Sequence, residues 1–167
     1  SEALSHAGYH HHAKVNIKWI NAGELVEGDA HEYLKDVDGI LVPGGFGPRA
    51  IEGKINAIKY ARENNIPYLG LCLGMQTATI EYARNVCGLK NANSSEFVNT
   101  KTDVIHLIPE QLKVKLKGGS MRLGAYPCEL KKKSKAFEAY KKVKISERHR
   151  HRFEVNNKFV DELEKNG

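Results

Sequence analysis

The sequence lacks the features that mark membrane and secreted proteins. No apolar run is long enough to cross a bilayer, and the first residues show no signal-peptide pattern. The chain has only three cysteines in 167 residues, Cys72, Cys87 and Cys128, and no C-x-x-C pair. This spacing argues against a disulfide framework and against a zinc site, so we expect no metal. The cysteine usage favours a reducing, cytoplasmic setting with no membrane partner.

Phosphate-binding and nucleic-acid-binding signatures are also missing. No G-x-x-x-x-G-K-[ST] loop occurs, so the chain is not expected to bind ATP through that motif. The net charge is +6, but much of it comes from lysines within 113–117 and 131–144, which are typical of a solvated face. We therefore expect no nucleic-acid partner. His10-His11-His12 share no face on a regular element and indicate a solvated loop.

What is present is an alternation of short apolar runs and helical stripes. Asp38–Val42 and Pro67–Leu71 read as buried strands, and Leu73–Val86 reads as a helix. Ile51, Ile55, Ile58 and Ala61 form an apolar stripe at helical spacing between the two strands. Two buried strands that alternate with helices through short connections predict an α/β fold with a mostly parallel central sheet flanked by helices. At this length one core and one domain are expected.

The remaining segments carry weaker patterns. We predict helices at 1–7, 134–140 and 160–165, strands at 15–20, 103–108, 121–130, 143–145 and 151–155, and a turn at Gly118-Gly119.

Gly70-Leu71-Cys72-Leu73-Gly74 lies between a predicted strand and a predicted helix. A nucleophile elbow has this form, because the sharp strand-to-helix turn leaves no room for neighbouring side chains and requires glycines. A thiol at a helix N-terminus is also favoured as the thiolate. From the pentapeptide alone, a buried structural cysteine between two packing glycines fits equally well.

Pro43-Gly44-Gly45-Phe46-Gly47 follows the first buried strand. Its exposed backbone N–H groups could form an oxyanion hole, and a tight packing turn is the alternative. In parallel sheets the ligand site lies at the carboxyl ends of the strands. We therefore expect this loop and Cys72 to be neighbours in space.

Several longer motifs carry a resemblance to a known family. Leu69-Gly70-Leu71-Cys72-Leu73-Gly74-Met75-Gln76 and Asn91-Ala92-Asn93-Ser94-Ser95-Glu96-Phe97 occur in order with P-G-G-F-G, G-G-S-M-R-L-G and E-R-H-R-H-R-F-E-V-N. Together they resemble the class I (triad) glutamine amidotransferase family and, within it, the glutaminase domains of the CTP synthase family. The resemblance implies a flavodoxin-like fold of this family with a nucleophile elbow.

The resemblance also implies roles for individual positions. Cys72 would attack the side-chain amide of glutamine and form a glutamyl thioester, with the oxyanion held by two backbone N–H groups. An amino-acid substrate needs an acidic group for its ammonium and an arginine for its carboxylate. The implied residues are Gly45 and Leu73 for the oxyanion, Gln76 and Glu96 for the α-amino group, Arg152 and the Phe153 backbone for the α-carboxylate, and Gly44 and Phe46 for the pocket. Without the resemblance, Glu96 and Arg152 would read as an exposed ion pair.

The residues of this sequence and the family pattern indicate different general bases. His149 or His151 could be taken as the base beside Cys72, and His151 with Glu154 even suggests a triad. The family instead carries its histidine and glutamate in a later H-P-E-F motif, and no H-P-E occurs here. We expect residues 1–167 to be an amidotransferase domain without that segment and without the family's first strand.

The implied activity is glutamine hydrolysis that supplies ammonia to a synthetase domain. That partner would aminate UTP to CTP with ATP and Mg, in an enzyme that is a homo-oligomer. This domain itself would need no cofactor, and GTP would act as an activator near Gly118–Gly124. Arg122 could bind an anion there, and an ion pair at the strand edge is an equally good interpretation of this residue. Two other classes stay open: a γ-glutamyl hydrolase or cysteine peptidase on the same scaffold, and a non-catalytic regulatory module.

Overall fold

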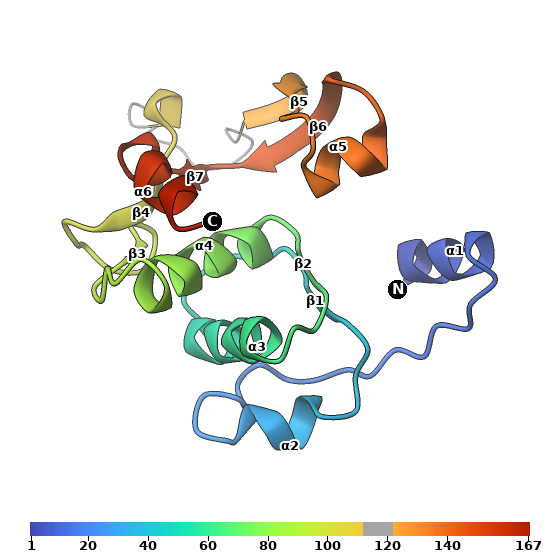
Figure 1. The fold of residues 1–167 in the computed structure, drawn as a ribbon. Helices are drawn as coiled ribbons and strands as arrows, with labels where there is room; N and C mark the ends of the chain where they lie inside the picture. The colour runs from blue at the N-terminus through green and yellow to red at the C-terminus, as the bar shows by residue number, and fades with distance from the viewer. Residues whose placement is uncertain (112–121) are drawn as a thin grey trace.

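A computed structural model describes residues 1–111 and 122–167. The central unit consists of two parallel strands and two helices (Figure 1). Strand β1 (Ile40–Val42) pairs with β2 (Tyr68–Gly70), with Val42 opposite Gly70. Helix α3 (Ile51–Glu63) connects the strands, and α4 (Leu73–Asn85) follows β2 after two residues. The predicted βαβ arrangement is confirmed in this unit.

A second sheet follows α4 and contains both parallel and antiparallel pairs. Strand β3 (Asn93–Ser94) runs parallel to β4 (Asp103–Leu107), and β7 (Phe153–Val155) runs antiparallel to β4. The short helices around it are η1 (Pro109–Gln111), η2 (Asn157–Phe159) and α6 (Val160–Lys165). The helix predicted at 160–165 is confirmed.

A hairpin with a helical connection forms the third unit. Strand β5 (Arg122–Glu129) pairs antiparallel with β6 (Lys144–His151) over eight residue pairs, and α5 (Lys135–Tyr140) lies between them. The two separate strands predicted at 143–145 and 151–155 are thus wrong in their bounds, since β6 continues to His151. The lysines of 113–117 and the predicted turn at Gly118-Gly119 lie outside the described residues.

The first helix lies apart from these units, whereas the residues around α2 (Ala30–Leu34) pack on α3, with Leu25 and Leu34 in one buried cluster with Ala57. Helix α1 (Glu2–His10) is separated from the rest of the chain in Figure 1, and α2 precedes β1. The strand predicted at 15–20 is wrong, because this segment adopts no regular structure. Alternating apolar residues form a strand only where a neighbouring strand supplies hydrogen-bond partners. No described strand pairs with it, and Trp19 is 80% exposed.

The core joins the first two units. The predicted apolar stripe of α3 is confirmed, since Ile51, Ile55, Ile58 and Ala61 are all buried. Full burial of each such aliphatic side chain stabilises the fold by about 1.5–3 kcal/mol. The core cluster continues through α4 to β4, with Leu73, Ile80, Ala83, Val104 and Ile105. Helix α4 is therefore held on the sheet by apolar packing along its length.

An ion pair between a buried carboxylate and a partly exposed arginine also ties α4 to α3. Glu81 is 1% exposed, and its Oε1 accepts hydrogen bonds from Arg62 Nη2 and Asn85 Nδ2, both at 2.9 Å. The hydrogen bond from the guanidinium to this carboxylate raises the pKa of Arg62. Removing one partner of such a pair is costly because the other charge stays buried.

Among residues 1–111 and 122–167, no helix is long and apolar enough to cross a membrane.

Candidate active site

Cys72 occupies a strained turn between β2 and α4. Its backbone has φ 53° and ψ −106°, a conformation that side-chain-bearing residues rarely adopt. The Gln76 N–H donates to the Cys72 carbonyl at 3.0 Å, so the helical hydrogen bonding begins at the cysteine itself. The side chain is exposed. This arrangement presents the thiol at the N-terminus of α4, as an elbow requires.

Two glycines make the turn sterically feasible. A Cβ added at Gly74 would lie 2.0 Å from the carbonyl oxygen of Val42, and one added at Gly70 would lie 2.5 Å from the carbonyl carbon of Gly74. Both distances are far shorter than any van der Waals contact, and the obstructing atoms are backbone. The helix therefore starts against β1 so closely that only glycine fits at these positions.

Two hydroxyl groups fix the first turn of α4. Tyr68 Oη donates to the Gly74 carbonyl at 2.8 Å, and Thr77 Oγ1 donates to the Leu73 and Gly74 carbonyls, both at 3.0 Å. Burial raises the pKa of the Tyr68 phenol, so the group stays neutral and able to donate. The elbow is thus held by hydrogen bonds from the strand before it and the helix after it.

The glycine loop after β1 lies beside the elbow. Leu71 N–H donates to the Val42 carbonyl at 3.0 Å, and a Cβ added at Gly44 would lie 3.3 Å from the Cβ of Cys72 and 4.0 Å from its Sγ. The predicted proximity of the two glycine motifs is confirmed. Within the described residues, neither the Gly45 N–H nor the Leu73 N–H donates a hydrogen bond. Both donors remain available next to the thiol.

Glu96 reaches the same loop from the second sheet. Its Oε1 accepts a hydrogen bond from the Gly47 N–H at 3.0 Å. Gly47 has φ +78°, and the side chain of Phe46 next to it is 64% exposed. A carboxylate therefore lies at the end of the glycine loop, two residues beyond Gly45.

Gln76 of α4 contacts the segment that carries Arg152 and Phe153. Gln76 is 5% exposed, and its Nε2 donates to the Phe153 carbonyl at 3.1 Å. Arg152 precedes this carbonyl, and its own carbonyl accepts from the Ile108 N–H at 2.8 Å. The Nη1 of Arg152 donates to Gln111 Oε1 at 2.9 Å. The structure thus connects Arg152 and Phe153 to Cys72 through one turn of α4.

Comparison with protein families identifies the family of this chain. The family model described as Glutamine amidotransferase class-I matches residues 1–166. The chain belongs to the class I glutamine amidotransferase family. The family membership that the motifs predicted is therefore confirmed.

Similar sequences cover nearly all of this amidotransferase chain. The CTP synthase of Desulfitobacterium hafniense (strain Y51) is 60% identical over 100% of the chain and 32% of its own length. The CTP synthase of Staphylococcus carnosus (strain TM300) is 57% identical over 99% of the chain and 31% of its own length. The chain thus spans about a third of the length of the curated relatives it matches.

A solved structure has the same fold. It is described as "Trypanosoma brucei CTPS - glutaminase domain with bound acivicin" and superposes with a TM-score of 0.88 at 39% sequence identity. The superposition covers 99% of this chain and 64% of that chain. The predicted class I amidotransferase fold is confirmed.

His106, His149 and His151 contact other residues of the second and third units. His149 lies on β6 opposite Gly124, and its ring is 5.3 Å from that of Tyr126 and 5.0 Å from that of His151. His106 Nε2 lies 4.0 Å from a carboxylate oxygen of Glu154 on the neighbouring strand. Within the described residues, no group of three or more metal-ligating side chains occurs.

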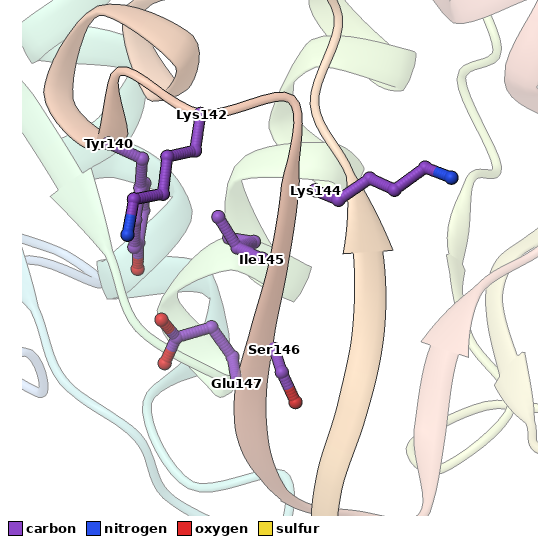
Figure 2. Close-up of a pocket in the computed structure, with 6 residues that line it drawn as sticks. All are labelled: Tyr140, Lys142, Lys144, Ile145, Ser146 and Glu147. Carbon is purple, nitrogen blue, oxygen red and sulfur yellow. The ribbon is translucent and has the colours of Figure 1, made fainter.

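A surface concavity is lined by residues 140–147, at the end of α5 and the start of β6. Figure 2 shows Tyr140, Lys142 and Glu147 on one side of β6 and Lys144 on the other. The hydrogen bond to the Glu147 carboxylate raises the pKa of the Tyr140 phenol. None of the residues that line this concavity is among the predicted site residues.

Three residues that position the site were missed by the sequence analysis. Gln111 binds Arg152 from 41 residues away, and Tyr68 binds the first turn of α4, with no local pattern that indicates either contact. Ser94 is fully buried and accepts the Glu96 N–H on its Oγ at 3.1 Å. A serine two residues before a glutamate could have indicated this turn.

Proposed function

We propose that this amidotransferase chain hydrolyses the side-chain amide of L-glutamine through a thioester on Cys72. The observation that carries the proposal is the position of the thiol. Cys72 lies in a strained turn at the start of α4, beside the Gly44-Gly45 loop, with the N–H groups of Gly45 and Leu73 both available. A tetrahedral oxyanion formed at this thiol needs such backbone donors.

In the proposed reaction the Cys72 thiolate attacks the amide carbon of glutamine. The carbonyl oxygen becomes an oxyanion that accepts from the Gly45 and Leu73 N–H groups. When the tetrahedral adduct collapses, the C–N bond breaks, ammonia leaves with one added proton, and the glutamyl thioester remains. Water then hydrolyses the thioester to glutamate and restores the thiol. The proton transfers require an acid–base group, and we assign that role to none of the described histidines.

The substrate's α-carbon end would be bound by groups on both sides of the elbow. We assign the ammonium to Glu96 and Gln76, and the α-carboxylate to Arg152 and the Phe153 backbone. Gly44 and Phe46 would line the pocket. A carboxylate at the loop and a guanidinium near β7 have the charges that a zwitterionic amino acid needs.

The whole enzyme is proposed to be a CTP synthase. The support is the naming of relatives about 60% identical to the chain, and the likeness to a glutaminase domain with bound acivicin. We propose that ammonia passes to a synthetase domain that uses ATP and Mg to aminate UTP, in a cytoplasmic homo-oligomer. No cofactor is assigned to residues 1–167, and no nucleic-acid partner. Of the segment Gly118–Gly124 considered for the activator GTP, residues 118–121 lie outside the described part of the chain.

Labelling of the cysteines tests the proposed nucleophile. A chloroketone analogue of glutamine should modify Cys72 and leave Cys128 unmodified, although both side chains are exposed. Peptide mass spectrometry locates the adduct, and excess glutamine should protect against it. Equal labelling of the two cysteines would refute the elbow assignment.

Steady-state assays test the reaction itself. Cys72→Ala should lower glutamine hydrolysis by on the order of 1,000-fold or more, because the residual rate lacks the covalent route. Cys128→Ala is the matched control and should retain wild-type activity. If Cys72→Ala is as active as the wild type, the chain acts as a non-catalytic module. If γ-glutamyl peptides react faster than glutamine, it is a hydrolase of another specificity.

A further inference from the structure

In the part of the chain that the structure describes, one hydrogen bond holds the loop that carries the Gly45 donor. Within the described residues, the Gly47 N–H is the only hydrogen-bonding group of residues 43–47 that has a partner, and that partner is Glu96 Oε1. Gly45 itself makes no hydrogen bond there, and the Phe46 side chain is 64% exposed. The conformation of this loop therefore depends on a carboxylate that lies 49 residues later in the sequence.

The backbone of Glu96 is fixed much more firmly than the loop it contacts. Ser94 is fully buried and belongs to β3, where it pairs with Ile105 of β4. Its Oγ accepts the Glu96 N–H at 3.1 Å, and its carbonyl accepts the N–H groups of Phe97 and Val98 at 3.0 and 3.1 Å. The Ser95 N–H donates to the Ile105 carbonyl at 2.9 Å. The turn that carries Glu96 is thus part of the second sheet.

From these contacts we infer that Glu96 is a positioning residue for the oxyanion loop, and that Ser94 fixes Glu96 in that role. One carboxylate oxygen holds the Gly47 N–H, two residues from the Gly45 donor. The other oxygen, Oε2, accepts no hydrogen bond within the described residues, so it can face the substrate ammonium. This inference rests on the proposed glutaminase function for its substrate part alone.

The two duties of Glu96 have different chemical requirements. Attraction of an ammonium needs the negative charge, whereas the Gly47 N–H needs only an acceptor oxygen in the same place. Glutamine at this position keeps an acceptor and loses the charge, and alanine loses both. Comparison of Glu96→Gln with Glu96→Ala therefore separates the positioning role from substrate binding.

Hydrogen exchange measures the positioning role without any substrate. In the full-length protein, Glu96→Ala should speed amide exchange in the peptide that covers residues 43–50 by about tenfold or more, since the tether is lost. Glu96→Gln should stay close to the wild type, and Ser94→Ala should lie between them. Ser95→Ala is the matched control, because Ser95 is exposed and its hydroxyl makes no hydrogen bond within the described residues. A peptide from β5 reports whether the fold is otherwise intact.

Kinetics measure the consequence for the reaction. Glu96→Gln should raise the KM for glutamine with kcat within about threefold of the wild type, whereas Glu96→Ala should also lower kcat by about tenfold or more, as for a misplaced oxyanion donor. Equal exchange in wild type and Glu96→Ala would overturn the inference, as would equal kcat values for the two Glu96 variants. A wild type that does not hydrolyse glutamine would refute the proposed function, and the exchange data would still decide the role of Glu96 in the loop.

Discussion

The elbow and the β5–β6 hairpin are stabilised in opposite ways. At the elbow, α4 starts so close to β1 that a methyl group at Gly74 would lie 2.0 Å from a backbone oxygen, and Leu73, Thr77 and Ile80 are buried. In the hairpin, none of the residues 123–151 is buried, and eight backbone pairs hold the strands together. Close backbone packing fixes one geometry, as a nucleophile needs. In the exposed hairpin, by contrast, the side chains remain free to contact other surfaces.

The largest expected effect comes from filling the closest contact at the elbow. Gly74→Ala should lower the free energy of unfolding by about 3 kcal/mol or more, because the new Cβ meets the Val42 carbonyl oxygen and backbone must move. Urea denaturation measures the change. Gly39→Ala is the control, since its Cβ would lie an ordinary 3.6 Å from the nearest atom, the Pro67 carbonyl oxygen. Similar losses in both variants would show that contact distance does not determine stability here.

A second substitution removes one donor at the elbow without touching the thiol. Gly45→Pro should lower kcat for glutamine by roughly 100-fold or more, because proline has no N–H to stabilise the oxyanion. Gly45→Ala keeps the N–H and places a Cβ 3.1 Å from Leu73 Cδ2, so it should lose much less activity. If the two variants have equal kcat values, the oxyanion is held by other groups.

A smaller effect is expected from the hydroxyl that binds the first turn of α4. Tyr68→Phe should cost about 1 kcal/mol of unfolding free energy, the usual value of one hydrogen bond. Tyr9→Phe is the control, because Tyr9 is 75% exposed. If Tyr9→Phe lowers the free energy of unfolding by the same amount, the loss in Tyr68→Phe cannot be assigned to the Tyr68–Gly74 hydrogen bond.

The same tyrosine predicts a pH dependence. Burial raises the pKa of Tyr68 in the folded state, so the phenol binds its proton more tightly there than in the unfolded chain. Its contribution is then fully present below about pH 10, the pKa of an unfolded tyrosine, and is lost as the pH rises above that value. We therefore measure the free energy of unfolding by urea denaturation at several pH values. Above pH 10 it should fall less steeply with pH in Tyr68→Phe than in the wild type. Identical slopes would contradict this assignment.

The smallest effect is expected in the hairpin. His149→Ala removes the ring contact with Tyr126 across the strands and the ring contact with His151 along β6, which should cost about 0.5 kcal/mol, as for a cross-strand pair. Glutamine hydrolysis should stay within about twofold of the wild type. A fall of 100-fold would place the general base in the hairpin and remove the functional contrast between the two regions.

Local patterns predicted the parts of the fold that depend on neighbouring residues. The apolar stripe of α3, the strands before Pro43 and Leu71, and the glycines of the elbow all follow from short-range periodicity and sterics. The segment 15–20 has a strand pattern and no strand, because pairing depends on a partner rather than on alternation. Likewise, β6 extends beyond the predicted 143–145 because β5 supplies a ladder to His151.

The site was predictable where the motif fixes the geometry and unpredictable where distant residues meet. Cys72 and the glycine loop were expected to lie together, and they do. The contact of Glu96 with Gly47, and that of Arg152 with Gln111, join residues 49 and 41 positions apart. The buried charge of Glu81 is also invisible in an apolar pattern, since Arg62 on another helix neutralises it.

The hydrogen bond from Tyr68 to Gly74 closes a ring of backbone around Cys72. Only six residues separate its ends, so the chain loses little entropy when the ring forms. The contact of Glu96 with Gly47 encloses a far longer loop and requires the second sheet to be in place. We therefore expect the strained cysteine turn to form early in folding, and the glutamate side of the site to be added later. The turn that carries Cys72 would then form before Glu96, which is proposed to bind the substrate, is in place.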